Sequence, residues 1–223
     1  MLDANACMND LAPRLRDAFG ARLVYLGLQG SYARGEADER SDLDVMCVLE
    51  GLSAADLDAY RQIVQGLPWA EKACGFICGR EELAAWNPLE IACLLRSTQD
   101  WVGSLKALVP ESTREDLRRF VQLSAGNLYH ELCQRRIYRG AARSVEALPG
   151  CGKMALYILQ ALALLETGSF PRTMAELTTL PSALDAQVAA RVLELRRGDA
   201  PHEQDFSLLL DWCRQALERA KNA

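Results

Sequence analysis

The spacing of apolar residues changes once along the chain, near Pro110, and this change limits the fold more than any other feature. Before it, four short apolar runs bounded by turn residues predict strands, over residues 23–29, 42–49, 72–78 and 101–105. Three stretches have helical spacing instead, over residues 10–20, 53–67 and 81–95. Ser53 is expected to cap the second of these helices and Pro88 to interrupt the third.

After Pro110 every predicted element is a helix, over residues 114–139, 152–165, 184–195 and 204–221. Strands mixed with helices, followed by helices alone, favour two domains. We therefore expect an α+β protein. Residues 1–106 are predicted to form an α/β sandwich with a small mixed sheet, and residues 107–223 an all-α helical bundle.

Composition narrows the class of protein. The formal net charge of −5 shows no basic excess that would indicate nucleic acid as the main partner. The apolar run from Met154 to Leu165 contains Gln160 and is shorter than the roughly 20 residues of a membrane span, so a buried core helix is expected.

The N-terminus has no secretory pattern, which predicts a cytoplasmic protein with reduced thiols. Cys74 and Cys78 are expected to be buried structural cysteines rather than a redox pair.

The residues that carry chemistry lie in one stretch, GSYARG at residues 30–35 followed by SDLDV at residues 41–45. Side chains two apart on a strand share a face, so Asp42 and Asp44 are expected to project together while Leu43 enters the core. Two neighbouring carboxylates repel each other unless a cation or a proton lies between them. Hard oxygen ligands of this kind favour Mg²⁺, which takes its other ligands from water and phosphates.

The turn before these aspartates is suited to binding an anion. A strand that ends in Gly30-Ser31 and turns into a helix presents backbone N–H groups and a hydroxyl to a phosphate. Glycine permits a close approach of the backbone. Arg34 follows one turn later and is expected to add a charge-assisted contact to phosphate.

Together these segments resemble the minimal nucleotidyltransferases of the DNA polymerase beta-like superfamily, whose signature is Gly-Ser followed by Asp-x-Asp on the next strand. The sequence GSYARGEADERSDLDV matches that signature at every diagnostic position. The resemblance implies that Gly30 and Ser31 hold the β- and γ-phosphates of a nucleoside triphosphate, with ATP expected. It also implies that Asp42 and Asp44 bind Mg²⁺ and act in catalysis.

The chain departs from this family in its third carboxylate, which active members carry on the next strand as a metal ligand or base. The predicted strand KACGFIC contains no acid. Glu71, just before it, is our predicted base, and a solvated loop glutamate is the alternative. Glu81, Glu82 and Glu90 follow on a predicted helix and are less well placed.

The helical half is similar in placement to the helical domains of antibiotic-modifying nucleotidyltransferases. In GKMALYILQALALLETGSFP a lysine opens a helix, and the resemblance implies that Lys153 reaches the triphosphate. A solvated lysine near a helix start is the alternative. Arg135, Arg136 and Arg139 form either a solvated face or a contact to nucleotide or a partner. His130 is expected to be a packed histidine, with a catalytic histidine as the alternative.

Three functions are consistent with these features. The first is Mg²⁺-dependent transfer of a nucleoside monophosphate to a hydroxyl of a small acceptor, such as an antibiotic. The second is the same chemistry on a protein or RNA end. The third is a nucleotide-binding protein that lacks catalysis. No sequence feature names the acceptor or the oligomeric state, for which a homodimer is one alternative.

Overall fold

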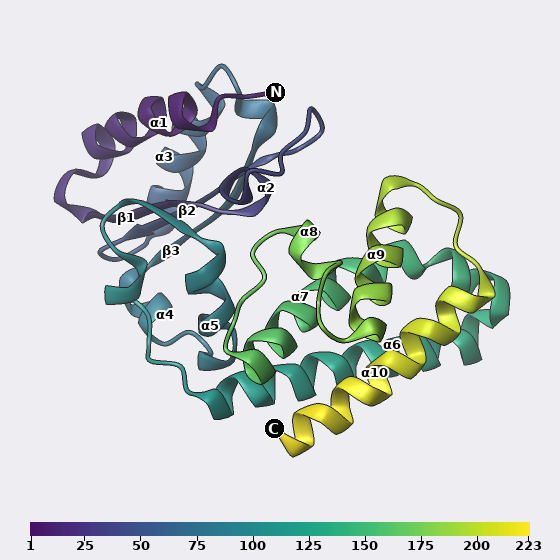
Figure 1. Cartoon of the computed structure of the whole chain (residues 1–223). Coiled ribbons are helices and arrows are strands. Elements are labelled where there is room, and N and C mark those ends of the chain that lie inside the picture. Colours follow the sequence, from purple (N-terminus) through teal and green to yellow (C-terminus); the bar gives the residue numbers. More distant parts are fainter. The chain divides into compact units, whose positions relative to one another are not determined.

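The computed structural model describes residues 1–223, which divide into two compact units, Met1–Glu111 and Ser112–Ala223 (Figure 1). The N-terminal unit combines a four-stranded sheet with helices, and the C-terminal unit contains helices only. The predicted α+β class, with a small mixed sheet followed by a helical region, is therefore confirmed.

The sheet contains β1 (Leu23–Leu28), β2 (Leu43–Leu49), β3 (Ala73–Gly79) and β4 (Gln99–Val102) in the order β3-β2-β1-β4. β1 pairs antiparallel with β2 and with β4, whereas β2 pairs parallel with β3. The last strand was predicted at residues 101–105, but it begins and ends earlier. It ends before Gly103, whose φ of +73° is a left-handed conformation that a strand does not adopt.

The helices of the N-terminal unit are α1 (Ala4–Phe19), α2 (Gly30–Arg34), α3 (Ala54–Gln65), α4 (Arg80–Ala84) and α5 (Pro88–Ser97), with short 3₁₀ turns η1 (Gly20–Arg22), η2 (Ala70–Lys72) and η3 (Leu105–Ala107). The prediction placed the start of α1 too late, because the Asp3 carboxylate caps the helix by accepting a hydrogen bond from the Ala6 N–H at 3.1 Å. The predicted cap at Ser53 is confirmed, and so is the break at Pro88, which is the first residue of α5.

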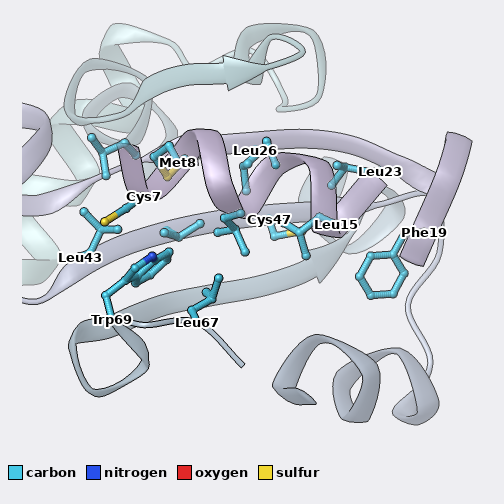
Figure 2. Close-up of a cluster of buried hydrophobic side chains, with 14 of the residues drawn as sticks. Cys7, Met8, Leu15, Phe19, Leu23, Leu26, Leu43, Cys47, Leu67 and Trp69 are labelled. Carbon is cyan, nitrogen blue, oxygen red and sulfur yellow. The ribbon is translucent and has the colours of Figure 1, made fainter. Parts of the chain in front are cut away.

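Both faces of the sheet are covered by apolar side chains. One face packs against α1 and α3 in a cluster that includes Leu26, Leu43 and Trp69 (Figure 2). The other face carries Met46 and Val48 and packs against residues of α4 and α5. Because Leu43 is fully buried on the α1 and α3 side, its neighbours along the chain point to the opposite face.

The C-terminal unit contains α6 (Arg114–Glu146), α7 (Leu148–Thr167), α8 (Met174–Leu177), α9 (Ala183–Arg197) and α10 (Glu203–Asn222). The end predicted at Arg139 coincides with a kink, because Gly140 has non-helical angles of φ 80° and ψ 173° inside α6. The short α8 was not predicted. It has a capping box between Thr173 and Glu176, but it lacks the length for an apolar period to be recognised.

The long helix α7 is the core of this unit. By length and composition alone it is apolar enough to cross a membrane, but 72% of its most apolar 18-residue segment is buried inside the protein. Gln160 interrupts the apolar run and is itself buried, with its Nε2 donating to the Pro171 carbonyl at 2.9 Å. The expectation of a buried core helix is confirmed, although the helix is longer than predicted.

Candidate active site

The two aspartates lie at the start of β2. Asp42 is exposed and precedes the strand by one residue, Leu43 is buried, and Asp44 is half-buried. The strand therefore begins one residue later than predicted. The alternation of exposure still directs both carboxylates away from Leu43, toward the sheet face that carries Met46.

Gly30 lies directly against Asp44. A Cβ atom on residue 30 would come within 1.9 Å of the Asp44 Oδ2 atom, and the φ of Gly30 is +68°. The neighbouring Gln29 N–H donates to the Asp44 carbonyl at 2.8 Å, which ties the end of β1 to the start of β2. The structure thus brings the Gly-Ser turn and the Asp-x-Asp segment into one site.

Ser31 and Arg34 both belong to α2, which begins at Gly30. The first N–H groups of a helix have no acceptor within the helix, so they are available to an anion. The Arg34 Nε donates to the Glu36 Oε2 atom at 2.8 Å, and each of these side chains is 22% exposed. A phosphate contact by Arg34 therefore competes with this ion pair.

The neighbouring strand β3 places Cys74 beside Asp44, because the two residues are direct partners in the parallel ladder. Burial, followed by the charge of Asp44, a hydrogen bond to that carboxylate and the charge of Asp42, raises the pKa of the Cys74 thiol. A backbone hydrogen bond from Gly75 partly opposes this rise. The expectation that Cys74 is buried is wrong, because the residue is exposed, whereas Cys78 further along β3 is buried.

The sequence predicts Glu71 as the base in place of the third carboxylate. That residue is exposed and lies in η2, just before β3 begins. The adjacent Lys72 Nζ donates to the Glu39 carbonyl at 3.1 Å, which holds the start of β3 near the loop before β2. Glu71 is therefore close in sequence to this end of the strand, while the residue in register with Asp44 is Cys74.

The three later glutamates, Glu81, Glu82 and Glu90, lie in helices after β3. Glu81 and Glu82 belong to α4, which follows the far end of β3. Because β2 and β3 are parallel, that end is about 20 Å along the strand from the aspartates. Glu90 lies in α5 and accepts a hydrogen bond from the Trp86 Nε1 at 2.9 Å.

In the C-terminal unit, Lys153 is exposed near the start of α7, with its Nζ 5.8 Å from the centroid of the Tyr157 ring. Arg135 pairs with Glu131, and Arg136 pairs with Glu203 at 2.6 Å. Both arginines therefore have acidic partners within the unit. The expectation for His130 is wrong, because its side chain lies on an exposed part of α6.

A known domain family matches part of the N-terminal unit, and a helical region follows it. Residues 9–82 match the family model described as a nucleotidyltransferase domain. Among solved structures, the chain is similar to spectinomycin adenyltransferase AAD(9) from Enterococcus faecialis, crystallised with ATP and spectinomycin. The TM-score is 0.61 at 13% identity, over 98% of this chain and 100% of that chain. No curated protein matches the sequence. The predicted architecture, similar to that of an antibiotic nucleotidyltransferase, is confirmed.

Proposed function

We propose that this protein is a Mg²⁺-dependent nucleotidyltransferase that transfers a nucleoside monophosphate from ATP to a hydroxyl of a small acceptor. The observation that carries the proposal is the contact between Gly30 and Asp44, which joins an anion-binding turn to a pair of carboxylates. The nucleotidyltransferase match over residues 9–82 supports the reaction class. The similar structure with ATP and spectinomycin supports a nucleotide and a small hydroxylated acceptor.

The donor set of the site fits Mg²⁺. This ion is usually held by one or two carboxylates and completes its shell with waters and substrate phosphates. The structure contains no cluster of three or more His, Cys, Asp or Glu residues suited to a metal. Asp42 and Asp44 would bind the ion together with the nucleotide, whose phosphates supply further ligands. When bound, Mg²⁺ neutralises triphosphate charge and stabilises the charge that develops on the leaving pyrophosphate.

The reaction forms a bond between the acceptor oxygen and the α-phosphorus. The bond from that phosphorus to the α–β bridging oxygen breaks, and its electron pair leaves with pyrophosphate. The backbone of Gly30 and Ser31, with the Ser31 hydroxyl, would hold the departing phosphates. The acceptor proton passes to a base, and Glu71 is our proposed base because it precedes the strand that borders Asp44.

Two further roles are proposed for basic residues, for Arg34 from its place in α2 and for Lys153 from the family resemblance. Arg34 is proposed to contact a phosphate after leaving Glu36, and Lys153 is proposed to bind the triphosphate. The ATP affinities of Arg34→Gln and Lys153→Met test these roles, with AMP as the comparison ligand that lacks the β- and γ-phosphates. We further propose that the protein acts in the cytoplasm.

The test combines binding with turnover. Isothermal titration with ATP and Mg²⁺ should show binding by the wild type, and pyrophosphate release should appear with spectinomycin or another small hydroxylated acceptor. Asp42→Asn and Asp44→Asn should lose the Mg²⁺-dependent binding, while Asp58→Asn, an exposed position on α3, should retain it. Unchanged Mg²⁺-dependent binding in both site variants would reject the site.

A second candidate function is nucleotide binding without turnover. The observation that favours it is the thiol of Cys74, which stands beside Asp44 in the strand position where active relatives are expected to carry an acid. ATP binding by the wild type without pyrophosphate release, across small-molecule, protein and RNA acceptors, would favour this function over transfer. Pyrophosphate release that depends on a protein or RNA end would instead identify a macromolecular acceptor.

A further inference from the structure

The strand β3 contributes a third side chain to the face of the sheet that carries Met46 and the two aspartates. Asp44 and Cys74 are direct partners in a parallel ladder, and such partners point to the same side of a sheet. Phe76 and Cys78, two and four residues further along β3, pack on the same face as Met46. Cys74 therefore lies on the face to which Asp42 and Asp44 point.

Gly75, which follows Cys74, has no room for a side chain next to β2. Gly75 has a φ of +121°, and a Cβ atom there would lie 1.9 Å from the Val45 carbonyl oxygen. No other residue type fits this position without moving the strand. The ladder pairing places Cys74 next to Asp44, and the thiol interacts with that carboxylate.

Cys74 differs from the other cysteines of the chain in its exposure. Five of the eight are buried, Cys93 and Cys133 are half-buried, and Cys74 is exposed. The buried cysteines behave as small core residues, which is the usual role of a free cysteine. Packing in the core does not account for Cys74, whose thiol interacts with the Asp44 carboxylate instead.

We propose that Cys74 is the third side chain of the nucleotide site, facing the bound triphosphate from β3 in the place where a carboxylate would complete the acid cluster. This inference rests on the proposed function. A thiol is a softer group than a carboxylate, so Cys74 lines the site without being a ligand of Mg²⁺. Two consequences follow: bound nucleotide covers Cys74, and an acid at position 74 strengthens the binding of Mg²⁺ with ATP.

The first consequence is measured by alkylation. N-ethylmaleimide is added to the full-length protein, and mass spectrometry follows modification of residue 74 with and without ATP and Mg²⁺. At ATP about ten times above its Kd, the rate at Cys74 should fall about tenfold, because only the free fraction reacts. The same comparison within Asp44→Asn should show no protection.

The second consequence is measured with two variants of similar size, Cys74→Asp and Cys74→Asn. The Mg²⁺ concentration that gives half-maximal ATP binding should fall about tenfold in Cys74→Asp, since an added charge acts on the cation through a partly screened medium. Cys74→Asn should not show this decrease. Thermal melting of both variants checks that they fold.

The outcomes separate the two proposals. Absence of ATP binding by the wild type would overturn the proposed function and this inference with it. ATP binding without protection of Cys74 would overturn the inference alone. An unchanged Mg²⁺ requirement in folded Cys74→Asp would also reject it, because the carboxylate would then not face the cation.

Discussion

A Cβ atom on Gly30 would lie 1.9 Å from the Oδ2 atom of Asp44, while the φ of Gly30 is +68°. Two independent requirements, a left-handed backbone and open space, thus coincide at one residue. The main chain of Asp44 is held by the Gln29 N–H, so a side chain at position 30 displaces the carboxylate.

Gly30→Ala should therefore damage the site more than the fold. We expect Mg²⁺-dependent ATP binding to weaken about 10- to 100-fold, the usual effect of disturbing the neighbours of a metal ligand. Gly35→Ala is the matched control, because Gly35 has a φ of +71° but open space around its Cβ position. Isothermal titration and thermal melting separate binding from stability. Equal ATP affinities in the two variants would contradict the role of the Gly30–Asp44 contact.

Glu71→Gln tests the proposed base. If Glu71 accepts the acceptor proton, kcat for pyrophosphate release should fall at least about 100-fold, with ATP affinity unchanged. Glu81→Gln is the control, because Glu81 lies in α4 beyond the opposite end of β3. An unaltered kcat in Glu71→Gln would discard Glu71 as the base.

The residues of the Gly-Ser turn and the Asp-x-Asp segment were predictable because their relationship is local. One strand, one turn and the next strand place them together, and residue spacing alone describes that path. Cys74 was not predictable as a site residue, because its place beside Asp44 depends on the register between β2 and β3. Register is set by packing between the strands, including the lack of room for a side chain at Gly75, and a strand pattern does not reveal it.

Helix boundaries were also only partly predictable from the sequence. The start of α1 was misplaced because a single capping side chain, Asp3, determines it and the apolar period becomes evident only later. The sequence predicts a helix end at Arg139, whereas α6 continues to Glu146 with a kink at Gly140, whose backbone angles are not helical. Pro88 was read correctly, since proline both ends one helix and suits the first turn of the next.

Asp56 links the start of α3 to η1 and should make the N-terminal unit sensitive to acid. Hydrogen bonds from Arg22 and from Ser53 hold the pKa of the Asp56 carboxyl well below its usual range. A carboxyl with a lowered pKa stabilises the folded state above its unfolded pKa of about 3.9, and this contribution is lost as the pH falls below that value. Asp56→Asn should therefore lower the free energy of unfolding at pH 7 more than at pH 3.

Urea denaturation at the two pH values measures this difference. Asp58→Asn is the control, since Asp58 lies on the same helix but is exposed. A loss of stability in Asp56→Asn that is the same at pH 7 and pH 3 would show that the charge of Asp56 does not contribute.

The C-terminal unit depends on a buried carboxylate, Asp185 of α9, which is 4% exposed. Its Oδ1 accepts hydrogen bonds from the Trp212 Nε1 at 2.8 Å and from the Arg219 Nη1 at 2.9 Å. The Arg219 Nη2 also donates to the Asp185 Oδ2 at 2.8 Å and to Glu166 at 2.6 Å. One carboxylate thus joins α9 to two positions on α10.

Asp185→Ala should lower the free energy of unfolding by about 3–5 kcal/mol, because it leaves a buried indole N–H without its acceptor and a partly buried guanidinium with one fewer partner. Asp211→Ala removes an exposed aspartate that pairs with Arg214, and it should change stability by about 0.5 kcal/mol or less. Urea denaturation followed by far-ultraviolet circular dichroism measures both variants. Combining Asp185→Ala with Trp212→Phe should cost less than the sum of the two single changes, since the indole donor is then absent. Additive losses would show that Asp185 stabilises the unit without the bond to Trp212.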